Sequence, residues 1–444
     1  GRIIMDKNFD EQLIKPVPNE RQTTIFEMGY YNFIHFGINT FTHKEWGSGH
    51  EPLTKFKLKT LDTDKWVQDL MATGSKGVIL TAKHHDGFCL FPSKYTDYCI
   101  KNTPFMDGKG DVVGSLAASC KKYNFKFGFY LSPWDRHEPT YGSEAYNDYF
   151  CNQLEELCTN YGEIFCVWFD GACGEGANGK KQRYDWERYY QTIHKYQPNC
   201  VISNCAYDIR WIGNEGGRCR EAEWSVVPKR LQCFDEVMRA SQQKEGTFAM
   251  AKIDNTDDDL GERHTIIEGE EMVFWPSEMD ISATYAGWFY RKWFEIFLAR
   301  SVNNLVACYM RSVGNNATLL VNVAPNPKGE LPAKFIRRMT RAKEKVQIIF
   351  KEQVECKLEK MSDFEYHITF PKGKVSKVVL GEDLSKSQRV ESFELYANGK
   401  KIFKSKTIGF KKFCIFGKID TDRIIVKVTD SRCEPYLGYA KVYR

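Results

Sequence analysis

The sequence predicts an α/β protein made of a (β/α)8-like barrel followed by a smaller antiparallel β-sandwich, and three observations support this prediction. Short runs of strand character alternate with amphipathic helical stretches through most of the first 345 residues. Polar and aromatic residues follow almost every one of these runs. The composition then changes near residues 337–346. We therefore expect a barrel domain over residues 1–345 and a β-sandwich domain over residues 346–444.

Seven runs have the apolar and aromatic character of strands. They cover residues 33–38, 77–82, 126–131, 164–169, 200–204, 272–276 and 318–323. Between them, stretches such as residues 111–123 and 146–161 place apolar side chains at helical spacing. Asp62 or Thr63 is expected to begin another helix that stops at Gly74. This alternation fits a (β/α)8 barrel, although a doubly wound sheet shows the same signature.

The residues at the strand ends distinguish these two folds. They are His35, Lys83, His84, His85, Asp86, Trp134, Asp135, Asp170, Asn204 and Asn322. A barrel gathers the carboxyl ends of all its strands at one face, so these side chains would converge on one pocket. No Gly-x-Gly-x-x-Gly follows an early strand and no Walker A sequence occurs, which disfavours a nucleotide-binding sheet.

The remaining residues read as short alternating strands with turns such as Asn398-Gly399, which is typical of an antiparallel sandwich. Residues 351–444 contain none of the ten Trp, and their 20 Lys and Arg against 13 Asp and Glu give a net charge of +7. Residues 1–350 then hold 43 basic and 45 acidic residues, a net −2. The near-neutral barrel suits an uncharged ligand, and the basic surplus is expected to be a solvated surface.

Composition excludes several classes of protein. The 63 basic and 58 acidic residues of the whole chain are too balanced for nucleic acid or an anionic membrane as the main partner. No run approaches the roughly 20 apolar residues of a membrane span. The fifteen cysteines form no Cys-x-x-Cys pair, so we expect most to be buried free thiols. The aromatic content of 14% suits either stacking on sugars or a large core.

Two acidic residues are candidates for chemistry. Asp170 follows the bulky run Val167-Trp168-Phe169 and is either a nucleophile at the barrel mouth or the N-cap of a helix. Glu215 lies in a glycine-rich loop and is either a protonated general acid or a solvated loop residue. Glu221 and Glu223 compete with Glu215 for the same role.

The pair His84-His85 follows a strand and is expected to bind vicinal hydroxyl groups. Adjacent side chains diverge, and the chain has no His-x-His and no His-Glu-x-x-His, so we expect no metal. No Gly-x-Ser-x-Gly elbow supports a serine triad. Two carboxylates, several histidines and many tryptophans at one barrel face indicate a glycosidase that needs no cofactor.

Seven strings resemble, in order, the motifs of glycoside hydrolase family twenty-nine, the retaining α-L-fucosidases. They are HFGINTF, TAKHHDGF, YLSPWDRHEPTYG, VWFDGA, RWIGNEGG, EAEWSVVP and ATLLVNVAPNPKGELP, and they cover roughly residues 20–335. The Gly-Asn-Glu loop that holds Glu215 is similar to that of the subgroup preferring α-1,3 and α-1,4 fucosyl linkages of Lewis-type glycans. The resemblance implies a retaining exo-α-L-fucosidase that acts on fucosylated oligosaccharides or glycoconjugates.

The resemblance also implies roles for individual residues. Asp170 would be the nucleophile and Glu215 the acid/base, with Glu221 and Glu223 in structural positions. Fucose would be contacted by His35, Glu45, Trp46, His84, His85, Trp134 and Trp288. The family is mostly secreted, periplasmic or lysosomal, and we expect a periplasmic or secreted protein whose signal peptide has been removed ahead of Gly1.

One departure from the family pattern lies before Gly287-Trp288-Phe289, where Tyr285-Ala286 replaces an expected Arg-Pro. A positive contact to the sugar is either lost there or supplied by another residue. Two alternatives therefore stay open, namely a catalytically impaired fucose-binding protein and an exo-glycosidase for another α-linked sugar.

Overall fold

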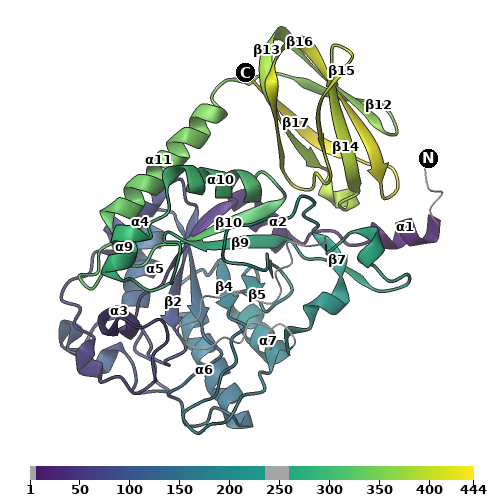
Figure 1. Ribbon diagram of the computed structural model, residues 1–444. Coiled ribbons are helices and arrows are strands. Elements are labelled where there is room, and N and C mark those ends of the chain that lie inside the picture. Colours follow the sequence, from purple (N-terminus) through teal and green to yellow (C-terminus); the bar gives the residue numbers. More distant parts are fainter. Residues whose placement is uncertain (1–6, 236–259) are drawn as a thin grey trace.

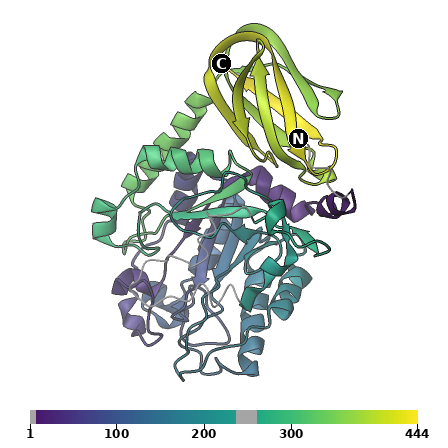
Figure 2. The same ribbon diagram turned by 45° about the vertical axis from the view of Figure 1, so that its right-hand side comes forward.

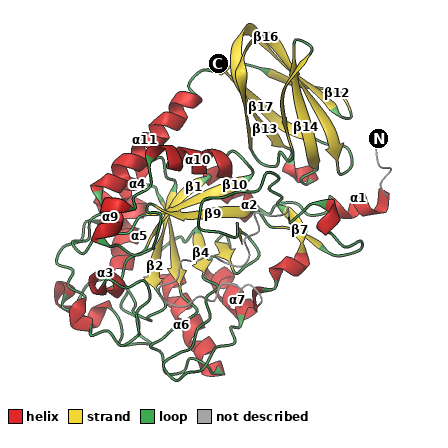
Figure 3. Cartoon of the chain, viewed as in Figure 1, coloured by secondary structure: helices red, strands yellow, loops and turns green. Residues whose placement is uncertain are grey.

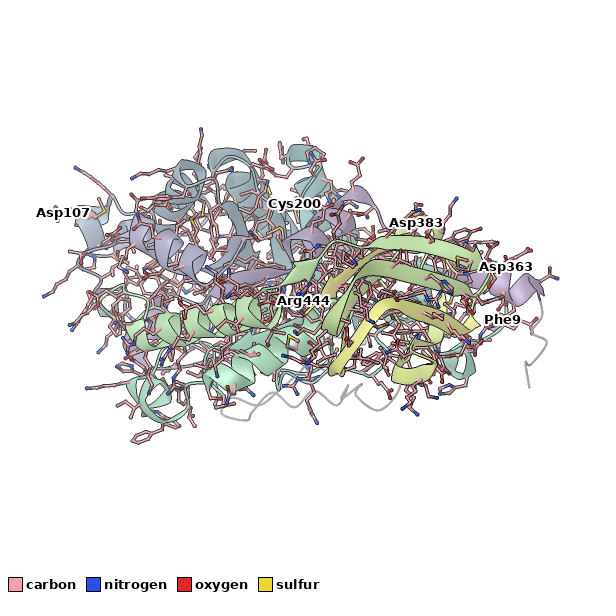
Figure 4. The ribbon with its side chains drawn as sticks, turned by 90° about the horizontal axis from the view of Figure 1, so that it is seen from above. Phe9, Asp107, Cys200, Asp363, Asp383 and Arg444 are labelled. Atoms are coloured by element: carbon pink, nitrogen blue, oxygen red, sulfur yellow. The ribbon has the colours of Figure 1, made fainter. Side chains whose placement is uncertain are left out.

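The computed structural model describes residues 7–235 and 260–444, and it consists of a parallel barrel and an antiparallel domain joined by a long helix (Figure 1). The antiparallel domain lies against one side of the barrel in two views 45° apart (Figure 2). Asp107 of the barrel and Asp363 of the antiparallel domain mark opposite ends of the molecule when it is seen from above (Figure 4). The predicted fold class is confirmed.

Eight parallel strands form the barrel in the order β5-β4-β3-β2-β1-β10-β9-β6. Their bounds are β1 Tyr30–Ile34, β2 Gly77–Lys83, β3 Lys126–Leu131, β4 Cys166–Phe169, β5 Val201–Asn204, β6 Arg210–Trp211, β9 Ser277–Ser282 and β10 Ala317–Asn322. Among the described residues, the only β-bridge between the β5 edge and the β6 edge is an isolated parallel one that joins Ser203 to Ile209. The barrel is therefore nearly closed, and β5 to β6 is its weakest seam.

Helices surround the barrel strands (Figure 3). Those of the barrel domain are α1 Lys7–Leu13, α2 Glu20–Met28, α3 Ile38–Thr42, α4 Thr63–Ala72, α5 Val112–Lys122, α6 Glu144–Asn160, α7 Trp186–Tyr196, α9 Lys292–Phe297, α10 Val302–Ser312 and α11 Ala333–Ile349. Asp62 caps α4, since its side chain accepts a hydrogen bond from the backbone of Lys65. Residues 205–209, all described, hold no helix, so β5 passes into β6 without the usual crossover.

One predicted strand was assigned to the wrong place. Residues 272–276 contain β8 Met272–Phe274, which pairs antiparallel with β7 Val226–Pro228 outside the barrel. The barrel strand is β9, which follows at once and is fully buried, but only Met279 and Ile281 of its six residues are apolar. A search for apolar runs misses β9 because two of its buried residues are acids. It also misses β6, because two residues are too few to show any pattern.

The C-terminal domain is a seven-stranded antiparallel sheet that curls around its own apolar core. Its strands are β11 Gln353–Val354, β12 Lys357–Ser362, β13 Glu365–Glu382, β14 Val390–Ala397, β15 Lys400–Ser405, β16 Lys412–Ser431 and β17 Leu437–Tyr443. Irregularities in the pairing of β13 with β16 allow these two long strands to bend, so both ends of each face the core. The helix α11 spans the predicted boundary at residues 345 and 346.

All fifteen cysteines lie in the described residues and are free thiols, and eleven of them are buried. This confirms the prediction for most of the cysteines. Cys233 is the one exposed cysteine. No helix within the described ranges has the length and apolar character needed to cross a bilayer. Gly1, ahead of which a removed signal peptide is expected, lies outside these ranges, and the secreted or periplasmic location stays a prediction.

Candidate active site

All nine residues predicted for the site lie at the carboxyl ends of the barrel strands or in the loops that follow them. They are His35, Glu45, Trp46, His84, His85, Trp134, Asp170, Glu215 and Trp288. Since parallel strands in a barrel end at one face, the fold brings these residues together although they are spread over 254 positions of the chain.

Asp170 comes directly after β4 and is not a helix cap. The next helix, α7, begins at Trp186 and is capped by Asp185, so the N-cap interpretation of Asp170 is wrong. The hydroxyl of Tyr130 donates to Oδ2 of Asp170 at 2.8 Å, and the backbone N–H of Ala172 donates to Oδ1 at 2.8 Å. Nε2 of His85 lies 3.8 Å from Oδ2. These donors stabilise an ionised carboxylate that still keeps part of its surface exposed.

Glu215 follows β6 in a tight loop and is half-buried. The loop is held by Asn214, whose Oδ1 accepts hydrogen bonds from the backbone of Gly216 and Arg218 at 3.1 Å each. Burial, followed by the negative charges of Asp170 and Glu45, raises the pKa of Glu215 to about 8, while a side-chain hydrogen bond with Trp288 acts in the opposite direction. A carboxyl in this environment is protonated at neutral pH, which suits a general acid.

The two rival acids have other environments. Glu221 is exposed. Glu223 is fully buried and forms ion pairs with Arg210 at 2.7 Å and with Arg220 at 3.3 Å. Burial alone would raise the pKa of Glu223, but the two guanidinium groups outweigh it and lower the pKa. A permanently ionised, fully paired carboxylate is a structural group, since it has no proton to donate.

Three histidines form one wall of the site. Nδ1 of His35 lies 2.9 Å from Oδ1 of Asn322, and Nδ1 of His85 lies 2.7 Å from the hydroxyl of Ser132. The ring of His84 lies between them, with centroid distances of 5.6 Å to His35 and 4.1 Å to His85. Its Nδ1 is buried without a hydrogen-bond partner. Burial lowers the pKa of all three imidazoles, to about 4 for His35 and His85, so they are neutral and offer both a donor and an acceptor.

Glu45 and Trp288 connect two distant loops of the rim. Oε1 of Glu45 accepts a hydrogen bond from the backbone N–H of Trp288 at 2.6 Å, whereas Oε2 is buried and has no partner. Burial raises the pKa of Glu45 to about 7. The indole of Trp288 lies 5.3 Å from the ring of His35. The unpaired Oε2 of Glu45 lies close to Gly287, and a ligand hydroxyl would satisfy it.

Trp46 and Trp134 form an aromatic corner on the other side of His85. Their ring centroids are 5.4 Å apart at near-perpendicular angles, and Trp134 lies 4.8 Å from His85. The indole N–H of Trp134 donates to the carbonyl of Glu175 at 3.1 Å, which fixes the orientation of the ring. Such a corner offers a flat apolar face beside polar groups, the combination that sugar rings require.

Sequence reasoning missed several residues that shape the site. Tyr130, taken as part of an apolar strand, donates to Asp170. Glu278 and Asp280 lie buried inside the barrel on β9, where Trp168 donates to Glu278 at 2.9 Å. Burial and then the neighbouring Glu278 raise the pKa of Asp280 well above its usual range. An acid-rich run preceding Gly287-Trp288 was the only signal for them. The described residues contain no cluster of three or more metal-ligating side chains.

The Tyr285 departure places an aromatic ring at the rim and a cation beneath it. The ring of Tyr285 is 50% exposed, and the guanidinium of Arg300 lies 4.9 Å from its centroid. The same guanidinium donates to the carbonyl of Ser282 at 2.7 Å and approaches the carbonyl of Glu215 at 3.4 Å. Arg300 thus places a buried positive charge beneath Tyr285, whose ring is half exposed next to the Glu215 loop.

Comparisons with known proteins agree with this site. Residues 19–344 match the sequence profile of the family described as alpha-L-fucosidase. The chain is 32% identical to alpha-L-fucosidase 1 of Arabidopsis thaliana, over 97% of this chain and 88% of that protein. A solved Bacteroides ovatus structure, provisionally named alpha-L-fucosidase, is 38% identical with a TM-score of 0.88, covering 100% of this chain and 77% of that one. A Ruminococcus gnavus GH29 fucosidase solved with fucose is 26% identical with a TM-score of 0.78, covering 100% and 97%.

Proposed function

The chain belongs to the alpha-L-fucosidases of glycoside hydrolase family twenty-nine, and we propose that it releases terminal α-linked L-fucose with retention of configuration. In the first step, Asp170 attacks the anomeric carbon while Glu215 gives its proton to the leaving oxygen. In the second step, Glu215 takes a proton from water, whose oxygen attacks the same carbon and breaks the fucosyl ester of Asp170. Fucose leaves, and both carboxyl groups return to their starting states.

One observation carries this assignment: the environments of the two carboxyls differ in the way that the mechanism requires. Asp170 receives hydrogen bonds from Tyr130 and Ala172, which stabilise its charged form. Glu215 receives the opposite influence, since burial and the charge of Asp170 raise its pKa to about 8. A pair of acids whose protonation states are set apart by their surroundings is the signature of a nucleophile beside an acid/base.

The remaining polar groups suit a neutral, hydroxyl-rich ligand. Nδ1 of His84 and Oε2 of Glu45 are buried and unpaired, and a sugar hydroxyl can both donate and accept a hydrogen bond. Neutral imidazoles at His35 and His85 leave their second ring nitrogen available for the same purpose. The methyl group of a 6-deoxy sugar would add about 1 kcal/mol when it is buried against apolar surface. This favours fucose over the corresponding galactose by a modest factor.

We propose further that the enzyme prefers α-1,3 and α-1,4 linkages of Lewis-type glycans. The support is the Gly-Asn-Glu loop and the open face of Tyr285 beside it. Glu215 protonates the bond between fucose and the rest of the glycan, so groups on the outer side of its loop face the aglycone. Tyr285, fixed from below by Arg300, offers that aglycone a stacking surface.

Two measurements test these proposals. Proton NMR of the first product should show the α anomer of L-fucose before mutarotation, and release of the β anomer would rule out the retaining mechanism. Oligosaccharides carrying α-1,2, α-1,3, α-1,4 or α-1,6 fucose should then be compared under identical conditions. We expect release from the α-1,3 and α-1,4 substrates; preferential cleavage of α-1,2 or α-1,6 linkages would overturn the linkage proposal alone. Fucose binding without turnover on any of them would favour an impaired binding protein.

A further inference from the structure

The loop that carries Glu215 lacks the support that the barrel gives to its other catalytic loops. It follows β6, which has two residues, and among the described strands β6 pairs over its length only with β9. No helix separates β6 from β5. The residues that follow the loop, Glu223 to Ser225, lead away from the barrel toward β7 and lie against the C-terminal domain.

A buried ion-pair cluster links the Glu215 loop to residue 223. Arg220 donates to the carbonyl of Ile212, three residues before Glu215, at 3.2 Å. The same guanidinium group pairs with Glu223 at 3.3 Å, and Arg210 of β6 pairs with Glu223 at 2.7 Å. Arg210 also donates to the carbonyl of Trp224 at 3.0 Å. The side chains of all three charged residues are almost fully buried, so displacement of Glu223 would displace both ends of the loop.

The C-terminal domain holds Glu223 and its neighbours from the other side. Gln388, fully buried between Asp383 and β14, accepts a hydrogen bond from the backbone N–H of Ser225 at 2.7 Å and donates to the carbonyl of Glu223 at 3.3 Å. Arg432, fully buried after β16, stacks its guanidinium on the indole of Trp224 at 3.6 Å from the centroid. Two side chains of the other domain thus contact three consecutive residues of the barrel domain, and they share this segment with Asn316 of the barrel, which donates to the carbonyl of Glu223 at 2.9 Å.

We infer that the C-terminal domain is a positioning element for the general acid, with Gln388 and Arg432 as positioning residues that act on Glu215 through Glu223 and Arg220. This inference rests on the proposed role of Glu215. It assigns the domain a part in the reaction that does not involve binding sugar. Neither residue reaches the substrate, so the effect of replacing them must appear through the proton that Glu215 delivers.

The test separates substrates by their need for that proton. A 4-nitrophenyl α-L-fucoside has a good leaving group and needs little acid assistance, whereas a fucosylated oligosaccharide needs a full proton transfer. Gln388→Met keeps the side-chain volume and removes the hydrogen bonds to Ser225 and Glu223, together with a longer one that Gln388 accepts from Asn316. We expect kcat on the oligosaccharide to fall about tenfold, with KM unchanged and less than about a twofold change on the aryl fucoside.

Arg432→Lys provides a second variant should Gln388→Met fold poorly, because it keeps the positive charge and loses the planar stacking on Trp224. The matched control is Phe410→Ala. Phe410 belongs to the same interface, but its ring stacks on Phe26 of α2 at 4.7 Å rather than on the segment 223–225. This control should lower the Tm and leave the ratio of the two substrates unchanged.

Glu215→Ala, measured alongside, distinguishes the role of Glu215 as the acid from the positioning role of the C-terminal domain. If Glu215→Ala affects both substrates equally, the assignment of Glu215 itself fails. If Glu215→Ala discriminates between them while Gln388→Met and Arg432→Lys do not, or if Phe410→Ala discriminates as strongly, the positioning role of the C-terminal domain is wrong and its contacts are only structural.

Discussion

The strand that carries Asp170 and the strand that carries Glu215 differ in how they are supported. β4 pairs with a parallel strand on each side, and its last residue, Phe169, packs against Phe150 of α6 and Tyr189 of α7, so the barrel itself sets the position of Asp170. β6 has two residues, one paired neighbour and one isolated bridge on its other side. The position of Glu215 depends instead on side-chain contacts: buried ion pairs, hydrogen bonds from Asn315 and Asn316 ahead of β10, and the second domain. One catalytic group is therefore built into the fold, and the other is held by contacts distant in sequence.

The largest effect is expected at the built-in group. Asp170→Ala should reduce kcat/KM about 10⁴-fold or more on every fucoside, because no other carboxylate can form the covalent intermediate. Azide should restore part of the activity on 4-nitrophenyl α-L-fucoside and give the β-fucosyl azide, detectable by mass spectrometry and NMR.

Asp185→Ala is the matched control for this change, since Asp185 caps α7 in the same connection. It should lower the free energy of unfolding by about 1 kcal/mol and leave the activity near that of the wild type. Wild-type activity in Asp170→Ala would show that Asp170 is not the nucleophile.

A smaller and substrate-dependent loss is expected at the second group. Glu215→Ala should lower kcat/KM on fucosylated oligosaccharides about 10²- to 10⁴-fold and on the aryl fucoside far less, since only the former needs a strong acid catalyst.

Glu221→Gln, at an exposed site, should change neither rate. Glu223→Gln should lower the free energy of unfolding by about 3 kcal/mol, because Arg210 and Arg220 lose a buried partner. Equal losses on both substrates would point to another acid.

The pH dependence of the activity reports on the protonation of Glu215. Glu215 must be protonated in the free enzyme, and its pKa is about 8, so kcat/KM on oligosaccharides should fall tenfold per pH unit above about pH 8. This basic limb should disappear in Glu215→Ala. The same raised pKa means that Glu215 stabilises the folded state at low pH. This contribution is lost as the pH rises from 4.5, the ordinary pKa of the carboxyl, to about 8. Chemical denaturation of wild type and Glu215→Gln across this range measures the loss; a constant difference would contradict the raised pKa.

The smallest effect is expected at the rim. Tyr285→Ala should raise KM on Lewis-type oligosaccharides about threefold to tenfold, because a stacking contact of about 1 kcal/mol is removed, and should leave the aryl fucoside unaffected. Tyr95→Ala is the control, since Tyr95 is 44% exposed and follows Ser93 and Lys94, which are held by Glu156 of α6. If the two variants behave alike on oligosaccharides, Tyr285 does not contact the aglycone.

The sequence predicted the residues on well-paired barrel strands more reliably than it predicted Glu215, whose loop also contacts the second domain. His84, His85 and Asp170 follow apolar strands, so their convergence could be inferred from barrel geometry. Glu215 follows a strand of two residues. The glycine-rich loop made it one of three candidate acids, and only the resemblance to a family selected it. The acids on β9 were missed because a buried polar strand has no apolar pattern.

The contacts of Gln388 and Arg432 could not have been foreseen from the sequence. They join positions more than 160 residues apart and belong to a domain whose sequence shows only alternating strands. Such contacts depend on how two domains dock, which local patterns do not encode. The same limit applies to the contact between the Arg300 guanidinium and the ring of Tyr285.

The distribution of the thiols has a practical consequence for spectroscopy. Cys233 is exposed while eleven other cysteines are buried, and burial raises the pKa of the half-buried Cys219, Cys356 and Cys433. A maleimide fluorophore added in slight excess should therefore attach first at Cys233, and intact mass should increase by one label. Cys233 lies next to Phe234, which packs against Trp275 and Trp186. The unmodified chain thus carries its own attachment point for a reporter group, five residues after the end of β7.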